Sequence, residues 1–101
     1  MDGEGVTLKV AGESRPSSVA GAICAGLRVR GQCEMQAIGA AAVNQAVKAL
    51  AVARAFLEAE GLQLVFVPSF LDLDVEGLER TAVRFHVRSR EEACPLLTPD
   101  P

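Results

Sequence analysis

The segment from residue 33 to residue 60 constrains the fold of this chain more than any other. Residues 33–38 (Cys-Glu-Met-Gln-Ala-Ile) are typical of a β-strand, Gly39 interrupts them, and residues 40–59 are an alanine-rich stretch typical of an α-helix. Glycine permits a sharp turn, and the helix that follows offers backbone N–H groups and its positive dipole end to an anion. The junction therefore predicts a mixed α and β domain with an anion-accessible helix start.

Hydrophobic periodicity and turn residues predict the other elements of the first half. Apolar and polar residues alternate over residues 6–11, as expected for a half-buried strand. Pro16 suits the first turn of a helix, with Ser17 or Ser18 as capping residues, and Gly31 is expected to end that helix. The buried stripes are expected at Val19, Ile23 and Leu27 in the first helix and at Val43, Val47, Leu50 and Leu57 in the second.

The second half of the chain is predicted to contain two further strands. Residues 62–67 are rich in β-branched and aromatic residues, and Pro68 is expected to end that strand. Residues 71–79 then form an acidic connection, and residues 80–90 alternate again. The order β-α-β-α-β-β with right-handed crossovers predicts an α/β (α+β two-layer) fold, with a four-stranded mixed sheet and two helices on one face. The other face is expected to be polar, with Lys9, Glu34, Gln36, Gln63, Arg84 and Arg88.

Length and composition indicate one domain, at residues 6–90, whose apolar surface is partly covered by another protein chain. Hydrophobic residues make up 50% of the 101 residues, which is a large share for a body of this size. We therefore expect a second copy of the chain to cover some of this apolar surface. Residues 1–5 and 91–101 are expected to be flexible acidic termini. Residues 6–90 carry ten basic and eight acidic side chains, a mildly basic balance that permits an acidic partner without demanding one.

Cysteine spacing and the first residues indicate the compartment. The three cysteines show no Cys-x-x-Cys spacing, so neither a disulfide framework nor a zinc site is predicted, and a reducing compartment fits best. Residues 1–5 lack the basic start and apolar run of a signal peptide. Asn44, Lys48 and Arg54 lie within the apolar helix and argue against a membrane span. We expect a cytoplasmic protein with no metal, no cofactor and no membrane partner.

The start of the second helix is the first candidate for chemistry. Asn44, Gln45 and Lys48 lie near it, and a glycine turn before a helix can bind phosphate when a cation closes the site. The Gly-Lys-Ser/Thr ending of a nucleoside-triphosphate loop is missing. An ordinary turn is the competing interpretation. Arg15, before the first helix, can likewise reach a phosphate or be a plain loop charge.

A row of basic residues on the last predicted strand is the second candidate. Arg84, His86, Arg88 and Arg90 are two residues apart and point to one side of the strand, which suits a phosphate backbone. The alternative is a solvated sheet face that pairs with Glu34 and neighbouring acids. The sequence gives little support for an enzymatic function. His86 is the only histidine, and no Cys or Ser lies at a spacing from it that is typical of a catalytic nucleophile and its base. No small-molecule substrate is expected.

Three segments carry a resemblance to a known family. They are residues 10–30, with Gly-Glu-Ser-Arg-Pro-Ser-Ser at 12–18, residues 35–56, with Gln-Ala-Ile-Gly-Ala and Asn-Gln-Ala-Val-Lys-Ala, and Pro-Ser-Phe at 68–70 with Glu-Arg-Thr-Ala-Val at 79–83. Over residues 6–90 the chain resembles the bacterial stage V sporulation protein S family. The resemblance implies a small cytoplasmic protein implicated in spore-coat assembly, septation and developmental regulation. It also implies the fold of the Alba chromatin proteins, which form dimers and bind DNA or RNA.

The wider Alba resemblance bears on the contact residues. Arg15-Pro16 matches the basic residue and proline that Alba proteins place at the start of the first helix. At the start of the second helix this chain has Gly39-Ala-Ala-Ala, and in the hairpin it has acids, where Alba proteins have basic residues. The resemblance thus implies weaker RNA or other nucleic-acid binding rather than tight duplex-DNA binding. The residues expected to make contact are Arg15, Asn44, Gln45, Lys48 and Arg80.

Two functions are compatible with the sequence. The first is a non-enzymatic regulatory protein that binds nucleic acid as a dimer or higher oligomer, with Arg15 and Lys48 on phosphates and Asn44 or Gln45 in polar contacts. The alternative is a protein–protein assembly module in sporulation or septation, without direct nucleic-acid contact, whose working surface is the apolar surplus.

Overall fold

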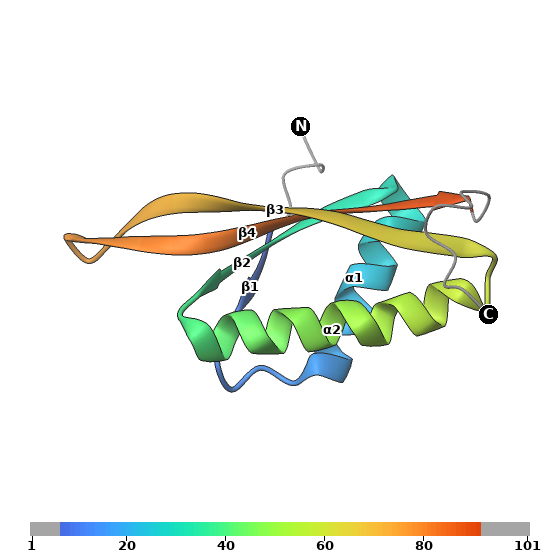
Figure 1. Cartoon of the computed structure of the whole chain (residues 1–101), viewed down its shortest axis with the longest axis horizontal. Helices are drawn as coiled ribbons and strands as arrows, with labels where there is room; N and C mark the ends of the chain where they lie inside the picture. The colour runs from blue at the N-terminus through green and yellow to red at the C-terminus, as the bar shows by residue number, and fades with distance from the viewer. Residues whose placement is uncertain (1–6, 92–101) are drawn as a thin grey trace, which may run out of the picture.

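The computed structural model describes residues 7–91. Its elements are β1 (Thr7–Val10), α1 (Pro16–Arg30), β2 (Gln32–Ile38), α2 (Ala40–Glu58), β3 (Leu62–Val75) and β4 (Leu78–Glu91), shown in Figure 1. The predicted order of strands and helices is therefore confirmed. The predictions for Val6 and for the termini at 1–5 and 92–101 lie outside the described residues, whereas residue 91 belongs to β4.

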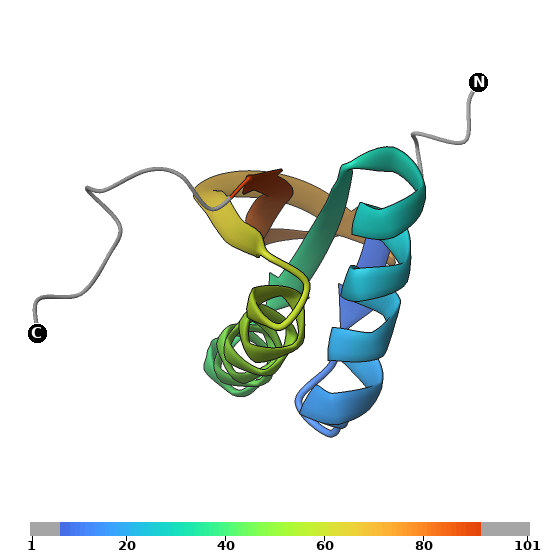
Figure 2. The same cartoon turned by 90° about the vertical axis from the view of Figure 1, so that its right-hand side faces the viewer.

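The four strands form one mixed sheet in the order β1-β2-β4-β3. β1 runs parallel to β2, and β4 runs antiparallel to both β2 and β3. Both helices lie on the same face of this sheet, with α1 toward the β1 side (Figure 2). The predicted four-stranded mixed sheet with two helices on one face is confirmed. One consequence is that the opposite face of the sheet is not covered by either helix.

Helix α1 begins and ends at the predicted residues. Pro16 occupies its first turn, and Gly31 ends it in the left-handed region with φ 79°, where glycine has no steric penalty. The buried stripe at Ile23 and Leu27 is confirmed. The capping prediction was wrong, because the residue before the helix is Arg15, which makes no side-chain cap hydrogen bond.

The buried stripe of α2 differs from the predicted one. Leu50 and Leu57 are buried as predicted, but Val47 is 46% exposed. The stripe consists mainly of alanines: Ala42, Ala46, Ala49 and Ala53. Small side chains let the two helices pack closely, and the Cys24 thiol lies 3.9 Å from the Ala53 carbonyl oxygen. α2 is also long and apolar enough, by length and composition, to cross a membrane, a property that core helices of soluble proteins share.

The region after residue 62 is a long hairpin rather than a short strand and a connection. β3 runs through Pro68 to Val75, and a two-residue turn at Glu76-Gly77 leads directly into β4. Both turn residues have positive φ, 53° and 83°, as a type I′ hairpin turn requires. The prediction that Pro68 ends the strand was wrong. β3 is an edge strand, and the backbone N–H that Pro68 lacks would point to the unpaired edge of the sheet.

The alternation of pairing explains why Pro68 is tolerated. Counting from the turn, Val75 and Leu78 form the first hydrogen-bonded pair, so hydrogen-bonded and non-hydrogen-bonded pairs alternate along the hairpin. Pro68 lies opposite Phe85 in a non-hydrogen-bonded pair. Its nitrogen therefore points away from β4, where a missing donor breaks no bond of the ladder.

The core lies between the helices and the inner face of the sheet. Its centre includes Met35 on β2 and Phe85 and Val87 on β4, all at most 3% exposed. On the opposite face, β1, β2 and β4 carry the predicted polar residues, since Lys9 pairs with Gln36 and Gln36 with Arg84. The prediction of a polar face was wrong for β3, where Val65 and Val67 lie opposite Arg88 and His86. Gln63 departs from this prediction, because it is only 8% exposed and its Oε1 has no hydrogen-bond partner among the described residues.

Candidate nucleic-acid interface

The start of α2 is open toward solvent. Gly39 has φ 91° and contributes no cap, and the first turn contains no acidic residue. The first intrahelical bond runs from the Val43 N–H to the Gly39 carbonyl oxygen at 3.0 Å. The N–H groups of Ala40, Ala41 and Ala42 therefore have no partner inside the helix. Together with the helix dipole, they favour an anion at this end.

The loop before α1 is held against this helix start. Ser14 closes a turn, because its Oγ accepts a hydrogen bond from the Ala11 N–H at 2.8 Å and its own N–H donates to the Ala11 carbonyl at 3.0 Å. The Gln45 side-chain amide then donates to the Ser14 carbonyl oxygen at 2.6 Å. Gly12 packs so closely that an added Cβ would lie 3.0 Å from the Ala41 Cβ. The starts of the two helices are thus joined.

This link brings most of the predicted contact residues to one side of the molecule. Arg15 follows Ser14 directly and is exposed, so it lies beside the second turn of α2. Asn44 and Lys48 are four residues apart on one helix face, and both are exposed. We call these residues, with Gln45, the helix-entry surface. Glu13, in the same loop, is the acidic residue nearest to them in sequence.

Gln45 lies near the start of α2 as predicted, but it makes a contact that the sequence did not predict. It is half-buried, and its amide nitrogen is engaged with the Ser14 carbonyl oxygen. It therefore holds the loop that carries Arg15, which makes it a positioning residue in the free protein. Nothing in the sequence pattern distinguished this role from a polar contact, because the partner is a backbone carbonyl 31 residues away.

Arg80 does not join the helix-entry surface within one copy. It lies on β4 opposite Leu73, close to the turn of the hairpin. Its even-numbered position puts it on the same side of β4 as Arg84, away from the helices. Arg80 belongs to the family motif at residues 79–83, but the motif does not indicate on which face of the sheet its side chain lies. Only the strand register defines that face.

The remaining polar row lies on the helix-free face. Arg84, His86 and Arg88 pair with Gln36, Glu34 and Gln32 of β2, respectively. The predicted alternative was pairing of the row with Glu34 and neighbouring acids. Glu34 lies opposite His86 in the sheet and lines a hollow with Arg84 and His86. Among the described residues, its carboxylate accepts a hydrogen bond from the Gln36 amide at 3.4 Å.

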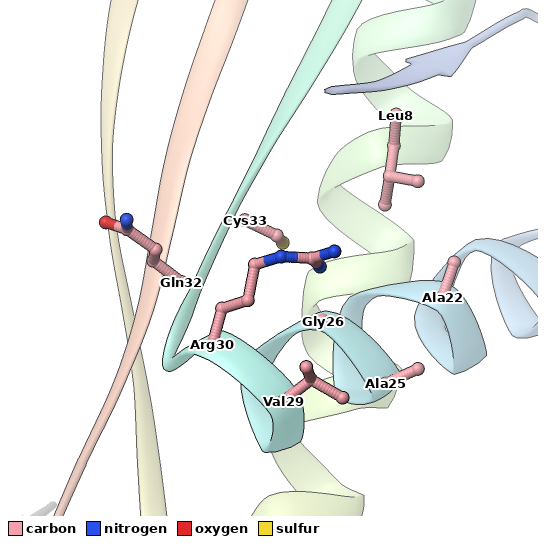
Figure 3. Close-up of a pocket in the computed structure, with 8 residues that line it drawn as sticks. All are labelled: Leu8, Ala22, Ala25, Gly26, Val29, Arg30, Gln32 and Cys33. Atoms are coloured by element: carbon pink, nitrogen blue, oxygen red, sulfur yellow. The ribbon is translucent and has the colours of Figure 1, made fainter. Parts of the chain in front are cut away.

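A cavity of about 330 Å³ lies between α1 and the β1–β2 edge, and Figure 3 shows its lining, which includes Leu8, Val29, Arg30 and Cys33. Burial raises the pKa of the Cys33 thiol to about 11, and burial also raises the pKa of Cys24. Both thiols are therefore protonated at neutral pH and weak nucleophiles. No group of three or more metal-ligating side chains occurs within residues 7–91.

The sequence matches a family model described as Stage V sporulation protein S over residues 6–90. The matched range begins one residue before β1 and ends one residue before the end of β4. It therefore contains both helices, the Gly39 junction and the whole helix-entry surface.

Proposed function

The chain belongs to the stage V sporulation protein S family, a sporulation-related family, and we propose that it is a non-enzymatic, cytoplasmic regulatory protein that binds nucleic acid as a dimer or higher oligomer. The observation that carries this proposal is the hydrogen bond from Gln45 to the Ser14 carbonyl oxygen. This bond holds the loop that carries Arg15 against the second turn of α2, and it supports a shared surface for Arg15 and Lys48, which follows that turn.

The chemistry of this surface fits phosphate. An Arg guanidinium can donate two hydrogen bonds to a phosphate, and a Lys ammonium acts as a mobile point charge. The helix start adds N–H donors that need no side chain. Asn44 offers an amide donor and acceptor beside them for a sugar or a base edge. Such contacts are mainly electrostatic and depend on salt more than on sequence.

We expect the double substitution Arg15→Ala/Lys48→Ala to weaken nucleic-acid binding about tenfold or more at low salt. It should also reduce the slope of log K against log salt by about one to two units, because two phosphate contacts are lost. Fluorescence anisotropy with a labelled oligonucleotide measures both quantities.

The matched control for this variant is Arg30→Ala/Arg54→Ala, which also removes two positive charges from exposed sites, one at the far end of α1 and one on α2. If both double variants bind equally, net charge alone governs the affinity and the helix-entry surface has no special role. If neither the variants nor the wild-type protein bind at low salt, the nucleic-acid function is wrong.

The dimer part of the proposal is supported by an apolar surface between α2 and β3, which we call the hairpin surface. It consists of Val47 on α2 and Phe66, Pro68 and Phe70 on the helix side of β3. Val47 is 46% and Phe70 80% exposed, and the hairpin extends beyond the start of α2 (Figure 1). Exposed apolar surface of this kind is typical of an interface, and a second copy of this chain carries the complementary patch.

The hairpin surface also favours the second candidate function, an assembly module with a protein partner. That function predicts stable self-association together with an unchanged behaviour of Arg15→Ala in every assay. The two functions therefore differ in whether removal of cations from the helix-entry surface has an effect.

A further inference from the structure

The helix-free face of the sheet carries a second line of cations, which we call the sheet row: Arg80, Arg84, His86, Arg88 and Arg90 of β4. Side chains two apart on a strand point the same way and are separated by about 6.8 Å. Arg84 to Arg90 therefore span about 20 Å. Arg84 is half-buried, while His86, Arg88 and Arg90 are exposed.

The positive charges of this row are not compensated by ion pairs with the described residues. The ion pairs within residues 7–91 join Arg28 to Glu60 and Arg54 to Glu58, both on the helix side. Within the described part of the chain, Glu34 is the only carboxylate at a paired strand position of the helix-free face, and its carboxylate accepts a hydrogen bond from Gln36. A polyanion that follows β4 would therefore meet cations with little local competition.

The two sides of the row differ in a way that suits nucleotides. On the β2 side lie amides, among which Gln32 contacts the His86 ring at 3.3 Å. A hollow of about 530 Å³ lies over β4 and is lined by Val67 and Ser69 of β3, by Arg84 and His86, and by Glu34 of β2. The Glu34 carboxylate there can accept a hydrogen bond from an amino group on a base edge. Val67 is 66% exposed. Aliphatic surface and a planar imidazole offer stacking partners for a base, and the amides offer hydrogen bonds to its edge.

The centre of this face is poorly shaped for groove reading of a duplex. Reading a major groove requires a protruding helix or a two-stranded ribbon that enters it, whereas residues 82–88 of β4 are flanked by β2 and β3 in a continuous sheet. A sheet face can instead bind a single strand whose bases are unstacked from each other.

We propose that the sheet row binds single-stranded nucleic acid, with phosphates along Arg84, Arg88 and Arg90 and a base against His86 and Val67. This inference rests on the proposed function for the class of ligand, but it names a second surface, on the opposite side of the sheet from the helix-entry surface. It also assigns a preference for single strands over duplexes.

The test uses the full chain and three labelled probes of the same mixed sequence: single-stranded RNA, single-stranded DNA and the DNA duplex. The substitution Arg84→Gln/Arg88→Gln should weaken binding of the single strands at least tenfold and reduce their salt slope by about one to two units. Duplex affinity should change less than threefold. Comparison of the two single strands shows whether a 2′-hydroxyl contributes. Arg88→Gln/Arg90→Gln, at two exposed positions, replaces the first variant if Arg84→Gln lowers the unfolding midpoint.

Substitutions of His86 test base stacking, which the arginine substitutions do not test. His86→Ala should weaken single-strand binding about fivefold or more, the range expected for one lost stacking partner, and His86→Phe should restore it. Equal losses for His86→Ala and His86→Phe contradict the stacking role of the row.

The outcomes separate this inference from the proposed function. If Arg84→Gln/Arg88→Gln binds the single strands like Arg30→Ala/Arg54→Ala while Arg15→Ala/Lys48→Ala loses affinity, the sheet row is wrong and the proposed function stands. Equal losses on single strands and duplex also overturn the single-strand preference. If the wild-type protein binds no probe at low salt, both are wrong.

Discussion

Met35→Ala is expected to lower the free energy of unfolding by about 2–5 kcal/mol, the range found when a large buried aliphatic side chain is truncated. Met35 is fully buried on β2. It lies between Leu8 of β1 and Phe85 of β4 in the sheet register, beneath the two helices. Because closely packed side chains such as Ile23, Leu57 and Phe85 surround it, the core can relax only partly into the space that the truncation leaves. Urea unfolding at a fixed protein concentration measures the change.

Two controls define what this result means. Met35→Leu keeps most of the volume and should cost less than about 1.5 kcal/mol. Val67→Ala removes an apolar side chain from the helix-free face, where Val67 is 66% exposed, and should change stability little. A loss for Met35→Ala below about 1 kcal/mol would mean that the core does not lie where the sheet register puts it.

Phe70→Glu is expected to dissociate the proposed dimer, raising its dissociation constant about a hundredfold or more. Phe70 lies opposite Val83 on the helix side of the hairpin and is 80% exposed. In a dimer through the hairpin surface its ring would be near the centre of the contact, where a buried carboxylate has no partner. Analytical ultracentrifugation over a range of concentrations measures the effect.

Val29→Glu is the matched control for this substitution. Val29 is 76% exposed, but it lies on α1 beside Leu8 of β1, and β1 and β3 are the opposite edges of the sheet. It should leave the association unchanged. A monomeric wild-type protein, or equal dissociation by Phe70→Glu and Val29→Glu, would exclude the hairpin surface as the interface.

The elements with strong local signals were predictable from the sequence. Gly39 separates a strand pattern from a helix pattern. Its φ is 91°, a backbone conformation that glycine alone adopts without steric penalty. The alternation around Phe85 likewise indicated which side of β4 is buried, and the register confirms it. These signals depend on the residue itself and its immediate neighbours, which is why no tertiary information was needed.

The features that failed depend on distant partners. Pro68 ends a strand only where its N–H would be needed, and that need depends on which edge of β3 is paired. Periodicity predicted Val47 in the buried stripe of α2, but the close approach of α1 selects the alanine face instead. In α2, periodicity alone favours the larger side chain over the alanines.

The candidate site shows the same division. The sequence identified Arg15 and Lys48 as candidate cations, but their shared surface depends on the bond from Gln45 to Ser14, which joins residues 31 apart. Arg80 carries the same charge and lies on the other side of the sheet, because it is an even number of residues from Arg84 on β4 and so shares its side. Residue type thus indicates the chemistry, and register decides which residues act together.

The most direct test of the nucleic-acid function is the affinity of the wild-type protein for a labelled oligonucleotide, measured by anisotropy at increasing salt. We predict detectable binding at low salt that weakens linearly on a log–log plot, with a slope of about −1.5 to −3 for two to four phosphate contacts on a single strand. An absence of binding at the lowest salt, or an affinity that does not change with salt, would contradict the phosphate contacts on which the account depends.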